Sequence, residues 1–354
     1  MASAVVSPTE PQGSVGQSSL GVRRYLWRLF VAQREIAPFV IALGLFVFFW
    51  IDSPAFLTTF SLEAVVGYAG PYAAIAAGEV LVLVLGEIDL SAGQVFLFAP
   101  WVMYWMWTSG IPVGWAILIA LGVAAGVGAI NGLITVMLNV PSFVTTLATN
   151  FVLLGMVLIF SNDTEATPVP GAVPPEVTSA AQHVGFFGQM FGVWEWSEIL
   201  WVLVIVLVVQ FMLTRTRFGV RVISTGGNLM GAAEAGVPVR RVKVWCFVIC
   251  SFLAGMVGIV DSIKYGSLDP GNLGINYILY AVAACVIGGT SLIGGRGTVI
   301  GALIGGLLIG VLEAGLTIIG ISSNDFYVYV GLVLIAAMAL NVWLDRVGAR
   351  TRTG

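Results

Sequence analysis

The chain has 354 residues and a formal net charge of −3, and only 9% of its residues are charged while 58% are hydrophobic. Its mean hydropathy is +1.00. A soluble chain of this length needs far more charge to cover its surface, so the composition excludes a soluble globular protein and indicates a membrane protein with many spanning segments. The apolar runs do not alternate with a period of two, as barrel strands do, so helices are the expected spanning element.

Residues 1–30 precede the first apolar run. They begin with MASAVVSPTEPQGSVGQSSLGV, a small and polar stretch without the apolar core of a cleavable signal peptide. We therefore predict a disordered tail, and we expect the first crossing to act as its own targeting signal.

The segment 36–344 contains ten apolar runs, and we predict an all-α, polytopic membrane protein with about ten transmembrane helices. A full crossing needs about 20 apolar residues, so we expect the shorter runs to be tilted, broken or extended by a residue or two. The runs cover residues 36–51, 60–85, 91–108, 112–137, 143–160, 199–213, 242–262, 276–287, 298–319 and 326–344.

Lysine and arginine residues gather in three places, and loops rich in these residues stay in the cytoplasm. Four precede the first run, six lie within 214–243 and three follow the last run. Six runs separate the first cluster from the second and four separate the second from the third, and these even numbers agree with three cytoplasmic clusters. We therefore predict a multi-pass protein of the cell (inner) membrane with both termini in the cytoplasm, including the tail 345–354.

Residues 161–197 then form an external loop, and this stretch contains several acids but no lysine or arginine. The lone histidine, His183, also lies there, which argues against an intramembrane enzyme that uses a histidine. Lys264 is the single basic residue that this orientation places on the external side, against the rule.

The central cytoplasmic loop, residues 214–241, contains a short AAEAG helix. Gly226 and Gly227 precede this helix, and Gly236 and Pro238 end it. Asn228 is well placed to cap its start through the side-chain oxygen. A helix of two turns or fewer is not stable alone and needs a surface to pack on. Two interpretations stay open from the residues alone: the helix docks in a groove of a partner protein, or it packs on the ends of its own membrane helices.

The stretch LGEIDLSAG places Glu87 and Asp89 between two apolar runs. An ionised acid at the bilayer centre costs about 2.5–3.5 kcal/mol, so these acids are expected at a helix end or beside a wet cavity. Asp89 lies two residues before Ser91, where a new helix begins, and we favour a capping role for it over contact with passing solute hydroxyls. Further acids inside or near apolar runs fit either a pathway lining or a helix end: Glu63, Glu79, Asp261 and Glu313.

Small residues and cysteines lie within the apolar runs. Six glycines recur at four-residue spacing, which allows helix backbones to approach closely: Gly122, Gly126, Gly301, Gly305, Gly306 and Gly310. The three cysteines, Cys246, Cys250 and Cys285, have no ligand partner in the sequence pattern, so we predict that they pack in the interior.

Three stretches resemble a known family, in consistent order over roughly residues 78–344. GGNLMGAAEAGVPVRRVKV is similar to the cytoplasmic coupling segment of permeases in ATP-driven sugar importers of the ribose, xylose and galactose type. LGEIDLSAG and residues 283–312, AACVIGGTSLIGGRGTVIGALIGGLLIGVL, resemble two further segments of these permeases. Glu87 departs from the family pattern, which has glycine there. Branched-chain amino acid permeases are more distant relatives.

The resemblance implies a permease subunit that moves a monosaccharide of the pentose or hexose class and does not itself hydrolyse ATP. The glycine-rich GGTSLIGGRG lacks the lysine of a phosphate-binding loop. The implied partners are cytoplasmic ATPase subunits, a second permease copy that makes a homodimer, an extracytoplasmic sugar-binding protein and the lipid bilayer, with no nucleic acid, cofactor, catalytic residue or metal. The residues implied to couple to the ATPase are Gly227, Asn228, Ala232, Ala233, Glu234, Ala235, Gly236 and Val237.

The translocation pathway is expected to use a few weak polar contacts. Our candidates for its lining are Asp89, Ser91, Asn131, Asn139, Thr290 and Ser291. The alternative function is a secondary transporter driven by an ion gradient, which would use Glu79, Glu87 or Asp89 as a proton or cation site.

Overall fold

The computed structural model describes residues 35–166, 197–321, 325, 327–333, 335, 336, 338 and 339. The predicted tails 1–30 and 345–354, and residues 167–196 of the predicted external loop, lie outside this part of the chain. Within the described residues the fold is helical, and its one isolated bridge pairs Ala166 with Leu268. The all-α prediction is therefore confirmed.

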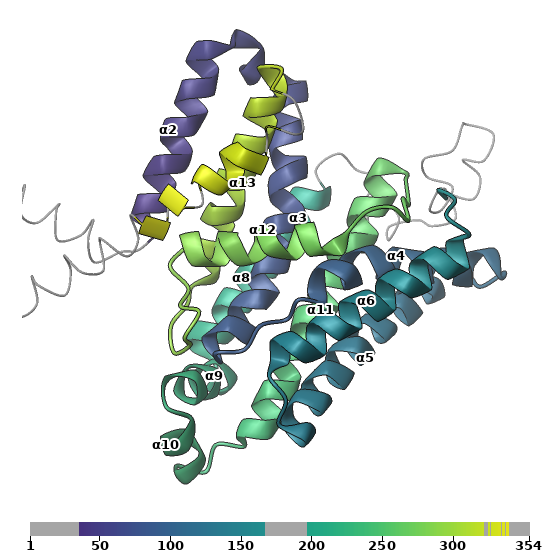
Figure 1. The fold of residues 1–354 in the computed structure, drawn as a ribbon, viewed down its shortest axis with the longest axis vertical. Coiled ribbons are helices and arrows are strands. Elements are labelled where there is room, and N and C mark those ends of the chain that lie inside the picture. The colour runs from purple at the N-terminus through teal and green to yellow at the C-terminus, as the bar shows by residue number, and fades with distance from the viewer. Residues whose placement is uncertain are drawn as a thin grey trace, which may run out of the picture.

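Each predicted run up to 298–319 coincides with a helix to within a few residues. The helices in chain order are α2 (Ile36–Asp52), the 3-10 helix η1 (Pro54–Leu57), α3 (Thr59–Val84), α4 (Ala92–Thr108), α5 (Val113–Leu138), α6 (Ser142–Ser161), α8 (Ser197–Arg215), α9 (Arg217–Gly227), α10 (Leu229–Glu234), α11 (Val239–Tyr265), α12 (Gly274–Ile287) and α13 (Val299–Ile318) (Figure 1). Among the described helices, six are long and apolar enough to cross a membrane, namely α3, α5, α6, α8, α11 and α13. The helices α2 and α12 are apolar but shorter.

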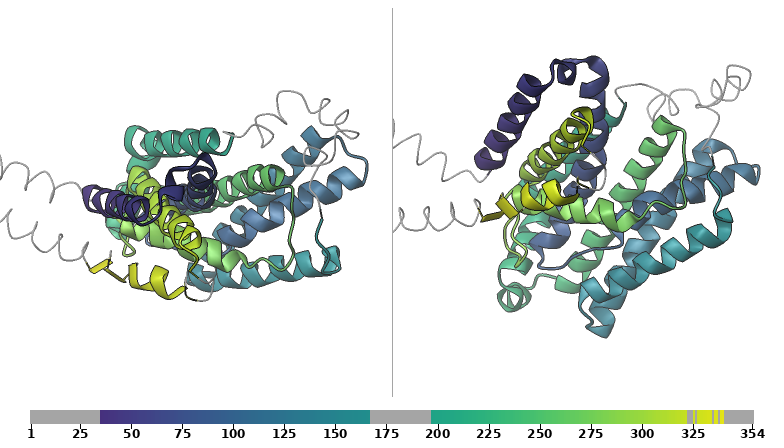
Figure 2. Two further views of the ribbon diagram at one scale, coloured as in Figure 1. Left: turned by 90° about the horizontal axis from the view of Figure 1, so that it is seen from above. Right: turned by 45° about the horizontal axis from the view of Figure 1, so that its top comes forward.

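Helix α3 occupies the centre of the fold and packs against α8, α11, α12 and α13. Helix α2 lies beside α13 on the outside of this group, and both views of Figure 2 show the two side by side. Helices α4, α5 and α6 form a second group that runs obliquely to α3 (Figure 1). Helix α11 connects the groups, because it contacts α3 on one side and α4 and α5 on the other.

Glycines bring α13 into backbone contact with its neighbours. A Cβ atom added at Gly310 would lie 2.7 Å from the Ala69 nitrogen on α3, and one added at Gly306 would lie 2.9 Å from the Ala73 nitrogen. Gly301 and Gly305 lie closer still to the backbone of α12 and its C-terminal end, since Cβ atoms there would be 2.0 Å from the Gly288 oxygen and 2.2 Å from the Ala284 oxygen. The predicted close approach is therefore confirmed for the late glycine stretch.

The same prediction is wrong for Gly122 and Gly126 within this chain, since a Cβ atom at either would meet nothing within 4 Å. Helix α5 instead approaches α11 through Gly128 and Gly132. A Cβ atom at Gly132 would lie 2.8 Å from the Val244 Cα atom. Four-residue spacing identifies one face of a helix, but it does not say whether that face meets a helix or open space.

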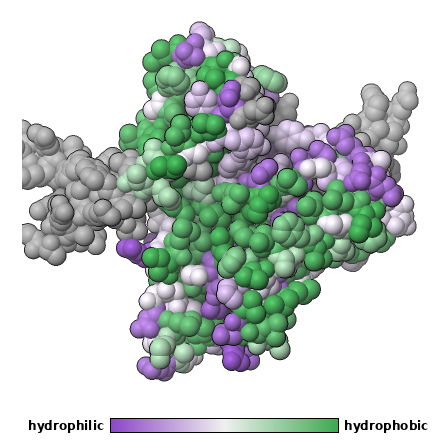
Figure 3. All heavy atoms as spheres, in the orientation of Figure 1, coloured by the Kyte–Doolittle hydropathy of each residue, from purple (hydrophilic) through white to green (hydrophobic). Residues whose placement is uncertain are grey.

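The outer faces of several helices are strongly apolar. Large hydrophobic side chains on α5, α6 and α8 are more than half exposed, among them Trp115 (64%), Phe151 (63%) and Leu207 (66%). Figure 3 shows hydrophobic residues over much of the visible face around α4, α5 and α6, with hydrophilic residues gathered at its ends. A surface of this kind suits contact with lipid rather than with water.

We predict that Gly310→Ala destabilises the protein by about 1–3 kcal/mol, because the added methyl group collides with the α3 backbone. Gly122→Ala is the matched control and should be neutral or stabilising, since alanine favours helix formation by up to about 1 kcal/mol over glycine. Thermal unfolding of both purified variants in detergent, followed by loss of the monodisperse chromatographic peak, measures the difference. Equal stability of the two variants would contradict the described packing of α3 on α13.

Candidate functional site

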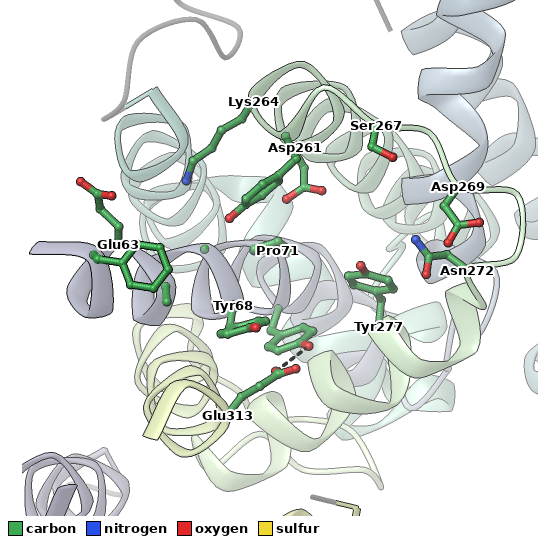
Figure 4. Close-up of a pocket in the computed structure, with 15 residues that line it drawn as sticks. Glu63, Tyr68, Pro71, Asp261, Lys264, Ser267, Asp269, Asn272, Tyr277 and Glu313 are labelled. Carbon is green, nitrogen blue, oxygen red and sulfur yellow. Dashed lines mark hydrogen bonds between the residues drawn. The ribbon is translucent and has the colours of Figure 1, made fainter. Parts of the chain in front are cut away.

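A cavity of about 680 Å³ opens at the amino-terminal end of α3, at the opposite end of this helix from α9 and α10. Its walls come from α3, α11, α13, the start of α12 and the segment that joins α11 to α12 (Figure 4). The lining residues are Phe60, Glu63, Ala64, Gly67, Tyr68, Pro71, Tyr72, Asp261, Lys264, Tyr265, Ser267, Asp269, Asn272, Tyr277 and Glu313.

Tyrosine side chains dominate the inner wall of this cavity. The Tyr72 hydroxyl donates a hydrogen bond to Glu313 Oε2 at 2.9 Å, which joins α3 to α13 across the cavity wall (Figure 4). The Tyr72 ring lies 6.0 Å from the Tyr277 ring between centroids and 5.2 Å from the Tyr280 ring. Such a wall offers phenol hydroxyls and carboxylates for hydrogen bonds and ring faces for C–H groups, so it suits a small polyhydroxylated solute.

A second hollow of about 350 Å³ adjoins the first. The two hollows share Tyr68, Tyr72, Asn272, Tyr277 and Glu313. The hydrogen bond between Tyr72 and Glu313 therefore lies at the boundary between them. Of the acids that the sequence left open, Glu63, Asp261 and Glu313 line the first cavity, whereas Glu79 does not.

Lys264 forms an ion pair with Glu198 of α8, and its ammonium lies 5.1 Å from the centroid of the Tyr265 ring. The Glu198 side chain is only 1% exposed. A buried carboxylate without a cationic partner is strongly unfavourable. The need to pair with Glu198 therefore explains why Lys264 is present on the side where the sequence analysis expected no basic residue.

Asp89 lies in a closed polar network at the link between α3 and α4, and its side chain is fully buried. One carboxylate oxygen, Oδ1, accepts hydrogen bonds from the Ser91 amide at 3.0 Å and the Ser91 hydroxyl at 2.6 Å. The other accepts from the Ser251 hydroxyl of α11 at 3.3 Å. Helix α4 begins at Ala92, with Ser91 as its N-cap residue and without a side-chain cap bond, so Asp89 fixes the turn before the helix instead of acting as the predicted cap.

The network continues into α5 and α6. The Asn131 side-chain amide donates to Ser91 Oγ at 2.8 Å, and the Thr149 hydroxyl donates to Asn131 Oδ1 at 2.6 Å. Three of the six pathway candidates, Asp89, Ser91 and Asn131, are thus in one hydrogen-bonded chain. All three are completely shielded from solvent in this conformation.

The other three candidates lie apart from this network. Thr290 is buried and Ser291 is half-buried in the loop between α12 and α13, where the Ser291 amide donates to the Arg296 carbonyl. Asn139 is exposed and ends α5 in the left-handed conformation, with φ of 53°. None of the six lines either described hollow, and their place in the pathway stays a prediction.

Two further acids, Glu79 and Glu87, interact with side chains that are distant in the sequence. Glu79 is fully buried on α3, where its carboxylate accepts hydrogen bonds from the Asp89 amide at 3.0 Å and the Cys250 thiol at 3.4 Å. Glu87 forms an ion pair with Lys243 in the first turns of α11. Glu87 therefore ties the link between α3 and α4 to the helix that follows the predicted coupling segment. All three cysteines are completely buried, as predicted.

The predicted coupling segment forms the six-residue helix α10. Asn228 Oδ1 accepts a hydrogen bond from the Gly231 amide at 2.9 Å, so the predicted cap is confirmed. Ala232 is buried against the neighbouring elements, whereas the Met230 side chain is 75% exposed. The remaining predicted coupling residues are exposed or, for Val237, half-buried: Gly227, Asn228, Ala233, Glu234, Ala235, Gly236 and Val237.

A backbone junction connects this segment to α3. The Gly295 amide donates to the Val84 carbonyl at the end of α3, at 2.8 Å. Gly226 of α9 lies against both groups, and a Cβ atom there would be 2.8 Å from the Gly295 nitrogen. Helix α9 and the loop before α13 therefore meet the end of α3 through backbone atoms.

The apolar helices and their exposed apolar faces are those of a helical membrane protein. The chain belongs to the family described as branched-chain amino acid transport system / permease component, which matches residues 61–338. This family description names branched-chain amino acids, whose permeases the sequence analysis took as more distant relatives, whereas the relatives below are named for sugars and confirm the suggested resemblance to sugar permeases.

Curated relatives align over most of their length and of this chain. The xylose/arabinose import permease protein XylH of Sulfolobus acidocaldarius is 30% identical over 94% of this chain and 89% of its own. The ribose import permease protein RbsC of Bacillus subtilis is 33% identical over 87% and 93%. The D-allose transport system permease protein AlsC of Escherichia coli is 30% identical over 86% and 90%. No solved structure matches the chain.

Asp89→Ala should destabilise the protein by about 1–3 kcal/mol, because it leaves the Ser91 amide and the Ser251 hydroxyl buried without an acceptor. Asp52→Ala, at the exposed end of α2, is the matched control and should change stability by less than about 0.5 kcal/mol. Chemical denaturation in mixed detergent micelles compares the two. A D89A variant as stable as D52A would show that the network contributes nothing to stability.

Proposed function

We propose that this chain is the membrane-spanning subunit of an ATP-binding-cassette importer and carries a monosaccharide of the pentose or hexose class into the cytoplasm. The observation that carries the proposal is the similarity, over most of both chains, to permeases named for ribose, xylose, arabinose and allose. Such a subunit is a pore component rather than an enzyme. The polar, tyrosine-lined cavity supports a route for a polyhydroxylated solute through an otherwise apolar protein.

In our proposed topology the chain crosses the cell (inner) membrane ten times, and both termini lie in the cytoplasm. Helix α10 then lies on the cytoplasmic side and docks with the ATPase through residues 227–237. The cavity at the other end of α3 faces outward, toward an extracytoplasmic sugar-binding protein. A second copy of the chain completes the pore as a homodimer.

The coupling route that we propose begins at α10 and ends at the cavity. ATP-driven movement of the ATPase displaces α9 and α10, and the junction of Gly226, Gly295 and Val84 passes this displacement to α3. Helix α3 carries Tyr68 and Tyr72 in the cavity wall, so its movement changes the shape of the cavity. Direct backbone contacts suit this task, because tightly packed groups transmit displacement instead of absorbing it.

The inner part of the pathway is proposed to form where the polar network is now closed. Asp89, Ser91 and Asn131 lie at the link between α3 and α4, beyond the cavity along α3. Movement of this link would uncover their hydrogen-bonding groups to a passing sugar. Thr290 and Ser291, in the loop that contacts the end of α3, are placed on the same inner side, together with Asn139.

Reconstitution in lipid vesicles tests the proposed function. The chain is combined with its partner ATPase and binding protein, and labelled ribose, xylose, allose and fructose are offered in turn. Uptake of at least one sugar should require ATP on the ATPase side and should persist when ionophores collapse the ion gradients. Accumulation by this chain alone, abolished by an ionophore, would instead establish the secondary transporter that uses Glu79, Glu87 or Asp89.

Met230→Gln should weaken binding of the ATPase at least about tenfold, which corresponds to about 1.4 kcal/mol, because the exposed methionine loses apolar contact at the docking surface. Met137→Gln, at the end of α5, is the matched control, since both side chains are 75% exposed. Pull-down titration of the detergent-solubilised variants against the purified ATPase measures the affinity. Equal binding by both variants would exclude the α10 face as the docking site.

A further inference from the structure

The cavity at the amino-terminal end of α3 is lined by four carboxyl groups and one basic side chain. We infer that it selects solutes by charge, and that it admits uncharged polyols and amine-bearing sugars while it excludes sugar acids and sugar phosphates. The inference rests on the proposed function only in taking the cavity as the route of the solute. The selection itself is a property of the side chains that line the cavity.

Four carboxyl groups surround the cavity from different elements (Figure 4). Glu63 comes from α3, Asp261 from α11 and Glu313 from α13, while Asp269 lies in the segment between α11 and α12. A cleft lined by groups of one sign and bounded by apolar walls focuses the electrostatic field and attracts solutes of the opposite sign.

The lining contains one basic side chain among the described residues, Lys264, and that side chain is already engaged. Its ammonium pairs with Glu198 outside the cavity lining and lies over the Tyr265 ring. An anionic solute would therefore lose water without gaining a free cation in exchange. Burial of an unpaired charge is strongly unfavourable, so the cavity opposes entry of an anion.

An uncharged or cationic solute meets the opposite situation. Asp261 has no hydrogen-bond or ion-pair partner within the described part of the chain, and its carboxyl group faces the cavity (Figure 4). Asn272 and the Tyr68 and Tyr277 hydroxyl groups offer further hydrogen-bonding positions for a polyol. An ammonium group gains carboxylate contacts and the faces of the tyrosine rings.

Thiol chemistry tests this inference on the purified chain without a partner subunit. The three native cysteines are 0% exposed, so a cysteine introduced at the exposed position Ser267, in the cavity lining, should be the reactive thiol. Ser267→Cys is treated in nanodiscs with a trimethylammonium methanethiosulfonate and, separately, with a sulfonate methanethiosulfonate. These reagents serve as cationic and anionic probe solutes. Ser109→Cys, exposed at the end of α4 and outside both hollows, is the matched control.

The ratio of the cationic to the anionic reaction rate should be at least about tenfold higher at residue 267 than at residue 109. Equal ratios, or a lower ratio at residue 267, would overturn the inference. This result does not depend on ATP-driven uptake, so failure of the proposed function and failure of the charge selection are separate outcomes.

Two substitutions identify the source of the selection. Asp261→Asn with Asp269→Asn keeps the side-chain shape and removes two carboxyl groups, so the ratio at residue 267 should fall toward that of the control. Glu198→Gln frees Lys264 and should lower the ratio in the same direction. If either variant fails to fold, the comparison of residues 267 and 109 in the parent chain still decides. An unchanged ratio in the folded variants would show that these charges do not select, which contradicts the inference.

Discussion

The backbone junction at the carboxyl end of α3 is the constraint on which the rest of the structure depends. The last carbonyl groups of a helix have no partner within it, and in an apolar protein such groups must be satisfied locally. The Val84 carbonyl obtains its partner from the Gly295 amide. Gly226 lies against the same two groups, where a Cβ atom would collide with both. Three segments that are far apart in the sequence are therefore held together by backbone atoms.

Helix α3 joins this junction to the cavity. Toward its amino-terminal end α3 carries Tyr68 and Tyr72 and packs on α13 at Gly306 and Gly310, and the hydrogen bond from Tyr72 to Glu313 joins the same pair of helices. At Gly306 and Gly310 the α13 backbone lies directly against Ala73 and Ala69 of α3. We therefore expect a displacement at the carboxyl end of α3 to move the cavity wall at its amino-terminal end. The proposed function as a transporter driven by a separate ATPase requires such coupling.

The few charged side chains within the helical body have identifiable tasks. Glu79 and Asp89 hold backbone amides and hydroxyls at the break between α3 and α4. Glu87 pairs with Lys243, and Glu198 pairs with Lys264. The carboxyl groups without such a partner, such as Asp261, face the cavity. The charged side chains named here thus lie at a helix break, beside an oppositely charged partner, or in the wall of the cavity.

The sequence by itself determined the helical class, the positions of the long apolar helices up to residue 318, the cap at Asn228, and the membership of the permease family. These features depend on local composition, on hydrophobic run length and on motifs, all of which are read along one stretch of chain. Only the tertiary structure decided that Tyr68, Tyr72 and Tyr277 form a cavity wall, that Glu87 belongs with Lys243, and that Gly128 and Gly132, rather than Gly122 and Gly126, meet α11. Periodicity defines the faces of a helix, but the partner of each face depends on contacts between residues far apart in sequence, which local pattern does not encode.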